Sequence, residues 1–341
     1  MAQQMNRRDF LKAMSITGAA LSLTACAAQT PVATTQALEA AVPKVDPNEK
    51  YIMVSNVAAH PYWLDAQYGG QDAAAALGVT WEYTGPADFD TPAQVTALEQ
   101  IISTKPAGLI VAALQPDAIT PAIDKALAAG IPLVTVDTDA PNSKRMTYLG
   151  TENYSAGRSM AKTMMEVMAG AGKVGLASVP GQFNLEERIR GIKDVFAESK
   201  GQMELVTVVD DKNDDAATAD AVVAMLQANP QINMVGSINA VGAGVASALR
   251  QTNNVGKIKA VTFDITEPII SALEDGSVQA TMVQRTYMMT FVGVYFLYYV
   301  NHPSKYLDNW KTNNIGLLPY AVDTGVMAIT KDQAAPFKPK S

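Results

Sequence analysis

The chain has 341 residues, a formal net charge of −7 and 17% charged residues, against about 25% in an average soluble protein. Hydrophobic residues make up 48%. The hydrophobic content argues against a disordered chain, and the negative net charge argues against a generally basic nucleic-acid binder. There are two histidines, His60 and His302, and one cysteine, Cys26. A Cys/His zinc site, a disulfide framework and a Cys–His nucleophile are therefore hard to build. We expect a binding protein of about two domains rather than a histidine-dependent enzyme.

Residues 1–25 are predicted to be a signal peptide. Arg7 and Arg8 give a positive n-region, and the apolar stretch that follows is too short to span a bilayer. The segment Asn6-Arg7-Arg8-Asp9-Phe10-Leu11-Lys12 resembles a twin-arginine export signal, with an ordinary secretory n-region as the alternative.

A cysteine follows the apolar stretch directly. Leu23-Thr24-Ala25-Cys26 resembles the lipobox of bacterial lipoproteins, which implies that Cys26 carries a lipid; an incidental cysteine is the alternative. Residues 26–47 are rich in Ala, Thr, Gln and Pro and are predicted to form a flexible tether. We therefore expect the protein outside the cytoplasmic membrane, attached by its lipid alone, in the periplasm or on the outer cell surface.

From residue 51 onward, β-like and helical runs alternate. In the first half we expect strands at 51–57, 79–83, 108–114 and 131–136, and helices at 61–77, 91–104 and 119–129. In the second half we expect helices at 155–169, 185–198, 216–228, 241–251, 267–273 and 287–300, and strands at 173–179, 203–209, 232–238, 258–263 and 279–283. The apolar run at 286–300 is too short and too rich in tyrosine for a membrane span, so it is predicted to be a buried helix. This alternation predicts an α/β protein with two doubly wound parallel sheets, divided near residue 150.

Polar residues follow the predicted strands in both halves. In open α/β sheets, ligands bind beyond the carboxyl ends of the strands. Each residue also has a plain alternative: Asp264 or Asn239 as a helix cap, Trp63 as a core residue, and Arg188 as a surface ion-pair partner. Carboxylates and amides match neighbouring hydroxyl groups, and aromatic faces pack on sugar rings, so the set favours a neutral sugar or polyol. The strand-end residues are Asn56, His60-Pro61-Tyr62-Trp63, Asp137-Thr138-Asp139, Gln182-Phe183-Asn184, Asn239, Asp264 and Gln284-Arg285.

Between about residues 48 and 330, the chain resembles the ribose/galactose-type periplasmic sugar-binding proteins that feed ABC transporters. The matching motifs are Pro61-Tyr62-Trp63, Val134-Thr-Val-Asp137, Asn184-Leu-Glu-Glu-Arg188-Ile-Arg-Gly191, Asn239, Phe263-Asp264 and Ala280-Thr-Met-Val-Gln284. The resemblance implies the type I periplasmic binding protein fold, with two Rossmann-like lobes joined by three crossovers near Thr151, Gln284 and Asp323. It implies an N-terminal lobe of 48–150 plus 285–323, and a C-terminal lobe of 151–284 plus 324–332.

The same resemblance implies roles for single residues. Tyr62 and Trp63 would stack on the sugar ring. Hydrogen bonds to its hydroxyls would come from Asp137, Arg188, Asn239, Asp264 and Gln284, with Asn184 as an addition. Their places at the predicted strand ends add His60 and Asp139 to the expected sugar contacts. The implied partners are an ABC permease and its ATPase; no catalytic residue, cofactor, metal, nucleic acid or second copy of the chain is expected.

Three departures from the family pattern leave the sugar open. Thr138 stands where ribose binders often have arginine, and His60 stands where Asn or Asp is common. The segment 211–214 lacks the aromatic residue that the second lobe often supplies.

Rival functions rest on weaker patterns. Gly242-Ala-Gly244-Val-Ala-Ser247 is a partial dinucleotide fingerprint, with Ser247 at the third glycine position. Asp137 and Asp139 could suggest glycoside hydrolysis, and Asp210, Asp211, Asp214 and Asp215 could suggest a metal site rather than a solvated helix-capping loop. A module that presents a bound sugar or autoinducer to a membrane receptor is the main alternative, whereas a transcription regulator would need a helix-turn-helix where the export signal stands.

Overall fold

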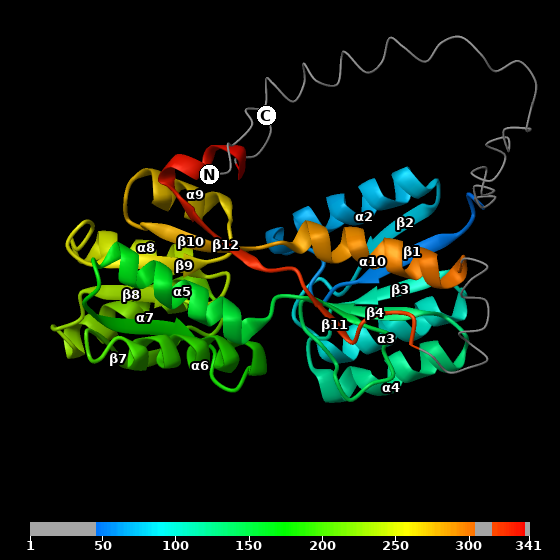
Figure 1. Ribbon diagram of the computed structural model, residues 1–341, viewed down its shortest axis with the longest axis horizontal. Coiled ribbons are helices and arrows are strands. Elements are labelled where there is room, and N and C mark those ends of the chain that lie inside the picture. Colours follow the sequence, from blue (N-terminus) through cyan, green and yellow to red (C-terminus); the bar gives the residue numbers. More distant parts are fainter. Residues whose placement is uncertain (1–45, 304–315, 338–341) are drawn as a thin grey trace, which may run out of the picture. The chain divides into compact units, whose positions relative to one another are not determined.

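The computed structural model describes residues 46–303 and 316–337. The predicted signal peptide, the lipobox at Cys26 and nearly all of the predicted tether lie outside these residues. The described chain forms two sheets of six strands each (Figure 1).

The first sheet has the strand order β11-β5-β4-β3-β1-β2, and all of its strand pairs are parallel. With the helices that cover it, we call it the N lobe. Its strands are β1 (Lys50–Val54), β2 (Thr80–Thr84), β3 (Gly108–Val111), β4 (Leu133–Val136), β5 (Tyr148–Gly150) and β11 (Ala321–Asp323). Its helices are η1 (Pro61–Trp63), α2 (Leu64–Leu77), α3 (Thr91–Ser103), α4 (Pro116–Ala128) and α10 (Thr286–Asn301).

The second sheet has the order β12-β10-β9-β8-β6-β7, and only the β10–β12 pair is antiparallel. We call this sheet and its helices the C lobe. Its strands are β6 (Gly172–Ser178), β7 (Met203–Asp210), β8 (Met234–Ser237), β9 (Lys259–Phe263), β10 (Ala280–Gln284) and β12 (Val326–Thr330). Its helices are α5 (Asn153–Val167), α6 (Phe183–Glu198), α7 (Asp215–Ala228), α8 (Gly242–Gln251), α9 (Glu267–Glu274), η2 (Lys331–Gln333) and η3 (Ala335–Phe337).

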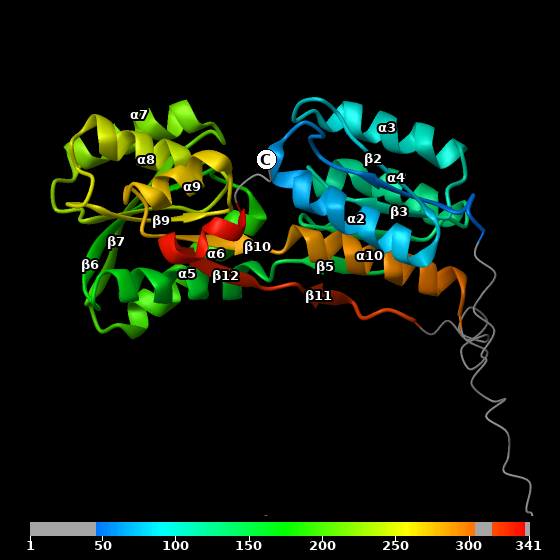
Figure 2. The same ribbon diagram turned by 90° about the horizontal axis from the view of Figure 1, so that it is seen from above.

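Each sheet is buried on both faces, as its continuous apolar strands require. In β1, Tyr51 and Met53 pack with residues of α2 and α10, whereas Ile52 and Val54 pack with residues of α3 and α4. Side chains alternate across a strand, so one strand supplies two separate cores. Figure 2 shows helices on both sides of each sheet. In the C lobe the two cores lie under α5 and α6 on one face and under α7, α8 and α9 on the other.

The apolar run at 286–300 is a helix of the N lobe, as predicted. α10 packs against α2 so closely that a Cβ on Gly69 would lie 2.1 Å from the Tyr287 carbonyl oxygen. Thr290 Oγ1 donates to the Ala66 carbonyl at 2.6 Å, which ties the two helices together. Within the described residues, no helix is both long enough and apolar enough to cross a membrane.

The chain passes between the two sheets after β5, after β10 and between β11 and β12 (Figures 1 and 2). The three short strands β5, β11 and β12 were not anticipated, because strands of three to five residues carry little periodic pattern. The helix expected at 119–129 begins earlier, with Pro116 in its first turn, where proline is well tolerated. The lobe boundaries given above stay predictions.

Candidate functional site

Two aspartates occupy equivalent places in the two sheets. Asp137 follows β4 and Asp264 follows β9, and both have left-handed backbone, with φ of 61° and 64°. The Asp137 N–H donates to the Leu149 carbonyl on β5 at 3.1 Å, and the Asp264 N–H donates to the Met282 carbonyl on β10 at 2.7 Å. Left-handed backbone is costly for residues other than glycine and concentrates at functional sites. The matching geometry gives each lobe one carboxyl group at the same point of its sheet.

Neighbouring strands hold these strained residues through hydroxyl groups. The Tyr148 hydroxyl on β5 donates to the Asp137 carbonyl at 2.7 Å, and Thr281 Oγ1 on β10 donates to the Asp264 carbonyl at 2.6 Å. Each aspartate is therefore fixed at both its N–H and its carbonyl, which stabilises an otherwise unfavourable conformation.

The carboxyl groups themselves are partly engaged. The Tyr62 hydroxyl donates to Asp137 Oδ1, and Gln284 Nε2 donates to Asp264 Oδ1 at 2.9 Å. Burial raises the pKa of both carboxyls, that of Asp264 to about 6, while the positive charge of Arg188 acts in the opposite direction. Tyr62 belongs to the N lobe, yet its pKa, raised first by burial, also responds to the charges of Asp264 and Arg188 in the C lobe.

Arg188 is a buried hydrogen-bond donor on α6. Its Nε donates to Asn153 Oδ1 at 2.9 Å, its Nη1 to the Ile238 carbonyl at 2.7 Å and its Nη2 to Gln284 Oε1 at 3.0 Å. Its guanidinium carbon also lies 4.0 Å from the centre of the Phe263 ring. The side chain is 3% exposed, so the alternative of a surface ion-pair partner is wrong.

Close approach of α5 and α6 places Arg188 at this point. A Cβ on Gly191 would lie 2.2 Å from the Tyr154 carbonyl oxygen, and a Cβ on Gly157 would lie 2.0 Å from the Arg188 carbonyl oxygen. Only glycine permits such contacts at both positions. The Arg188-Ile-Arg-Gly191 motif therefore combines a buried donor with the glycine that brings its helix into place.

Gln284 connects the strand ends to the first crossover. Its Oε1 accepts from Thr151 Oγ1 at 2.7 Å as well as from Arg188, while its Nε2 holds Asp264. Both Gln284 and Thr151 are buried. The amide is thereby oriented without ambiguity, because its donor and acceptor ends have different partners.

The aromatic pair after β1 divides into one core residue and one residue near the strand ends. Trp63 is 1% exposed, and its Nε1 donates to Asn56 Oδ1 at 3.1 Å. Its ring belongs to the N-lobe core and meets the half-buried Tyr62 edge-on, with the ring centroids 4.9 Å apart, and its stacking on a sugar stays a prediction. His60 caps η1, since its Nδ1 accepts from the Tyr62 N–H at 3.1 Å, and burial lowers its pKa.

Asp139, predicted as a sugar contact, is engaged elsewhere. Arg145 donates to it from Nε at 2.5 Å and from Nη2 at 2.6 Å, and Thr135 Oγ1 donates to it at 2.6 Å. Arg145 is buried, and its Nη1 donates to the Tyr320 carbonyl just before β11. This ion pair uses both carboxylate oxygens within the N lobe, and a sugar contact of Asp139 stays a prediction.

Asn239 lies buried after β8 in the C lobe. Its Nδ2 donates to Asp211 Oδ1 at 3.2 Å and to Asn213 Oδ1 at 3.3 Å, and Ser237 Oγ donates to its Oδ1 at 3.2 Å. It does not cap a helix, because α8 begins after Val241. Asp264 does not cap one either, because α9 begins after Thr266.

The remaining predicted residue, Asn184, lies half-buried in the first turn of α6, where Gln182 is the N-cap. The acidic loop after β7 caps α7, since Asp214 accepts from the Ala217 N–H at 2.8 Å. Among residues 46–303 and 316–337, no three His, Cys, Asp or Glu side chains lie close enough together to hold a metal ion.

The sequence did not indicate that Asn153, Thr151 or Tyr148 would hold the site residues in place. All three lie near the first crossover rather than directly after a strand that we had predicted, and their roles come from contacts with residues of later elements. The position of Thr151 at a predicted crossover was the one available signal.

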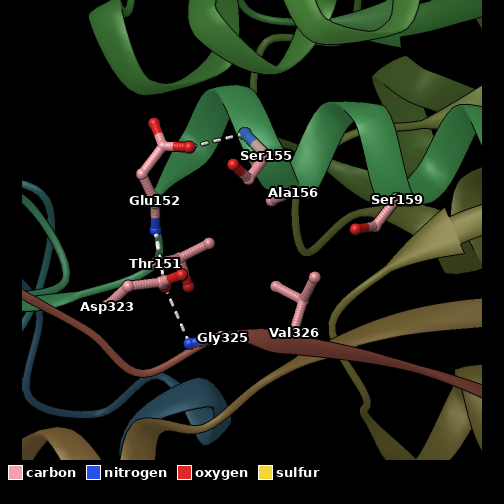
Figure 3. A pocket seen from close by; sticks show the side chains of 8 residues that line it. All are labelled: Thr151, Glu152, Ser155, Ala156, Ser159, Asp323, Gly325 and Val326. Carbon is pink, nitrogen blue, oxygen red and sulfur yellow. Dashed lines mark hydrogen bonds between the residues drawn. The ribbon is translucent and has the colours of Figure 1, made fainter. Parts of the chain in front are cut away.

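The first and third crossovers lie side by side at a cavity of about 190 Å³. Figure 3 shows Asp323 between Glu152 and Gly325: its Oδ1 accepts from the Glu152 N–H at 3.0 Å and from the Gly325 N–H at 2.8 Å. The Glu152 side chain caps α5 by accepting from the Ser155 N–H at 2.7 Å. The segments that join the lobes are thus tied to each other and to a helix end.

Comparisons with known proteins give the class. Residues 51–301 match the family model described as the periplasmic binding protein domain. A sugar-binding protein of a sugar ABC transporter from Bacillus halodurans is 32% identical, with a TM-score of 0.81 over 85% of this chain and 100% of that chain. The arabinose-binding protein AraP from Geobacillus stearothermophilus is 35% identical, with a TM-score of 0.79 over 86% and 100%. The xylose/arabinose-binding protein XylF of Sulfolobus acidocaldarius is 26% identical over 310 residues, 85% of this chain and 73% of that protein.

Two α/β lobes joined by three crossovers, with polar side chains at the strand ends, define the type I periplasmic binding protein class. The chain belongs to the periplasmic binding protein family, among its sugar-binding members of the ribose/galactose type. Members of this family act outside the cytoplasmic membrane, and the relatives reported above are named as binding proteins rather than enzymes.

Proposed function

We propose that this protein captures a neutral monosaccharide between its two lobes and delivers it to an ABC permease. The observation that carries the proposal is the grouping of Asp137, Arg188, Asp264 and Gln284 with Tyr62 at the strand ends. Carboxyl, amide and guanidinium groups suit the hydroxyls of a sugar, and one cation among two carboxyl groups does not suit a phosphate. Asn239, Asn184 and the Nε2 side of His60 complete the proposed site.

The ligand that we propose first is an aldopentose. Relatives with 26% and 35% identity are named for xylose or arabinose, and they match more than four-fifths of this chain. Thr138 in place of a second arginine leaves room and polarity for hydroxyl groups without another fixed charge.

Calorimetry with arabinose, xylose, ribose, galactose and a sugar alcohol tests the binding step. We expect at least one pentose to bind below millimolar, and Asp264→Ala and Arg188→Ala to weaken it strongly. Binding by none of these ligands, or unchanged binding in both variants, would overturn the proposed site.

Delivery is tested in cells that lack this chain. They should lose high-affinity uptake of the labelled sugar and regain it when the chain is restored. Unchanged uptake, despite sugar binding by the purified protein, would point instead to presentation of the sugar to a membrane receptor.

We also propose that the protein is exported by its twin-arginine segment and anchored by a lipid on Cys26, as a monomer. The support is the order of n-region, short apolar stretch and lipobox in the sequence. Cys26→Ser should move the protein from the membrane fraction to the soluble extracytoplasmic fraction, and retention at the membrane would contradict the anchor.

A further inference from the structure

The loop after β7 contains a buried carboxyl group that the sugar contacts proposed above do not use. Asp211 is 0% exposed. Its Oδ1 accepts from the Asn213 N–H at 2.8 Å and from Asn239 Nδ2 at 3.2 Å. Its Oδ2 has no hydrogen-bond partner in the described part of the chain.

Such a group opposes folding. A buried carboxyl oxygen without a partner loses its hydration and gains little in return. Burial raises the pKa of Asp211, and the neighbouring charges of Asp210 and Asp215 act in the same direction. The position of Asp211 therefore points to a task other than stabilising the C lobe.

Its contact with Asn239 identifies that task. Both hydrogens of Asn239 Nδ2 are directed to oxygens of the loop, on Asp211 and Asn213, and its Oδ1 receives one hydrogen bond from Ser237. A carboxamide oxygen accepts two hydrogen bonds, so one acceptor position of Asn239 is left. The contacts with the loop therefore use the NH2 group of the Asn239 amide and leave its oxygen available to a ligand.

We propose that Asp211 is a positioning residue for sugar binding: it fixes the Asn239 carboxamide so that its oxygen, and not its NH2 group, accepts a hydroxyl hydrogen of the ligand. This inference rests on the proposed function, and it adds the direction of one hydrogen bond: the sugar donates and Asn239 accepts. With Asp137 and Asp264, the site then offers three acceptor side chains to hydroxyl donors.

Ser178 provides a matched control. It ends β6, is 1% exposed and has an Oγ without a partner among the described residues. Its carbonyl accepts from the Asp211 N–H at 3.2 Å, so it lies in the same neighbourhood without a hydrogen bond to Asn239. Ser178→Ala removes a buried, unpartnered polar atom and leaves the amide held.

Calorimetry with the bound sugar separates these roles. Asp211→Ala should weaken binding about tenfold, the effect of about one hydrogen bond, while Ser178→Ala should leave it unchanged. Asp211→Asn should stay within about threefold of the wild type, because its carboxamide oxygen can accept from Asn239. If Asp211 acts through Asn239, the double variant Asp211→Ala/Asn239→Ala should bind no more weakly than Asn239→Ala alone.

A second measurement needs no sugar. In NMR spectra of the free protein, the Asn239 side-chain amide hydrogens should exchange slowly in the wild type and in Ser178→Ala, and quickly in Asp211→Ala. Asp211→Leu, which fills a similar volume, replaces the alanine variant if that one does not fold. Full additivity in the double variant, or unchanged amide protection in Asp211→Ala, would overturn the inference. A wild type that binds no sugar but shows this protection would overturn only the proposed function.

Discussion

Residues at the strand ends differ in how far the protein already uses their hydrogen-bonding capacity. Arg188 has five N–H groups, three of which donate to Asn153, Ile238 and Gln284. The other two have no acceptor in the described part of the chain and are available to a ligand. Asp264 has one oxygen on Gln284 and one without a hydrogen-bond donor among residues 46–303 and 316–337. Asp139, by contrast, has both oxygens on Arg145. A ligand can therefore compete for Arg188 and Asp264 far more easily than for Asp139.

The first prediction at the scale of single residues concerns the branched guanidinium group of Arg188. A lysine has one nitrogen in place of three, so Arg188→Lys cannot reach Asn153, Ile238 and Gln284 together. We expect sugar binding to weaken about 100-fold, or about 3 kcal/mol, as for loss of a buried charged donor with several partners. Calorimetry gives the comparison, and Arg190→Lys is the control, since that side chain is exposed and pairs with Glu187. Equal affinities of the Arg188→Lys variant and the wild type would contradict the role of the fork.

Asp264 carries the second residue-scale prediction, on stability and pH. Its folded pKa of about 6 lies above the usual 3.8 because of burial, so the folded protein binds this proton more tightly than the unfolded chain. The contribution of the protonated Asp264 carboxyl to the free energy of unfolding is fully present below about pH 4 and is lost as pH rises through 6. Asp264→Asn removes this dependence, and near pH 7.5 we expect the variant to be more stable than the wild type, by up to about 3 kcal/mol.

Urea unfolding without sugar at pH 4.5 and pH 7.5 measures that difference. The gain in Asp264→Asn should be larger at pH 7.5 than at pH 4.5, while the exposed Asp220→Asn should show no such change between the two. A gain that is the same at both pH values would show that the Asp264 carboxyl does not titrate in this range.

Elements position these residues through close packing. The pair α5 and α6 carries Asn153 and Arg188, and glycines at 157 and 191 allow the two helices to approach until backbone nearly meets backbone. In the N lobe, Gly69 plays the same part between α2 and α10. Helix packing at this distance has no flexible side chain that could move aside, so the position of Arg188 depends on it.

Gly191→Ala tests this packing. The added Cβ would lie 2.2 Å from the Tyr154 carbonyl oxygen, so α6 must shift, at a cost of about 1–3 kcal/mol, and sugar affinity should fall with the displacement of Arg188. Gly293→Ala in α10 is the matched glycine control, because its Cβ would meet side chains and no backbone: the end of Ile110 at 3.0 Å and Val134 at 3.7 Å. Thermal unfolding should show a lower midpoint for Gly191→Ala and an unchanged or higher one for Gly293→Ala. The reverse order would show that α5 and α6 have room to adjust.

The elements were predictable from the sequence where the pattern is local. Continuous apolar runs such as 108–114 depend on neighbouring residues, and the structure confirms a strand there, β3 over Gly108–Val111. The short strands β5, β11 and β12 depend on a partner strand that the local sequence does not show.

The candidate site shows the same limit. Alternation of strands and helices predicted that Asp137, Asn239, Asp264 and Gln284 would stand at strand ends, and they do. The burial of Trp63 and the pairing of Asp139 with Arg145 depend on packing and on a loop that returns to the sheet. Residue type and spacing do not determine either of these.

At the scale of the whole molecule, the crossovers connect the binding residues to lobe movement. Gln284 ends β10 at the second crossover and bonds Thr151 at the first. Asp323 at the third crossover bonds the backbone of Glu152 at the first. A sugar that contacts Gln284 therefore acts on a residue that is hydrogen-bonded to one of the segments that join the lobes. We expect the lobes to close on the sugar by turning about these segments.

Asp323→Ala tests whether these ties set the balance between open and closed lobes. The variant removes the acceptor for the Glu152 and Gly325 N–H groups. The first and third crossovers then keep only the backbone bond from the Thr324 N–H to the Gly150 carbonyl, and we expect open forms to gain population. Apparent affinity falls with the fraction of binding-competent molecules, and we expect a Kd about three- to tenfold higher although Asp323 does not touch the proposed sugar site. Small-angle scattering should show a larger radius of gyration without sugar and a normal decrease at saturating sugar. Asp323→Asn keeps an acceptor oxygen and should resemble the wild type; if the alanine variant does so too in both affinity and scattering, the ties at the crossovers do not govern closure.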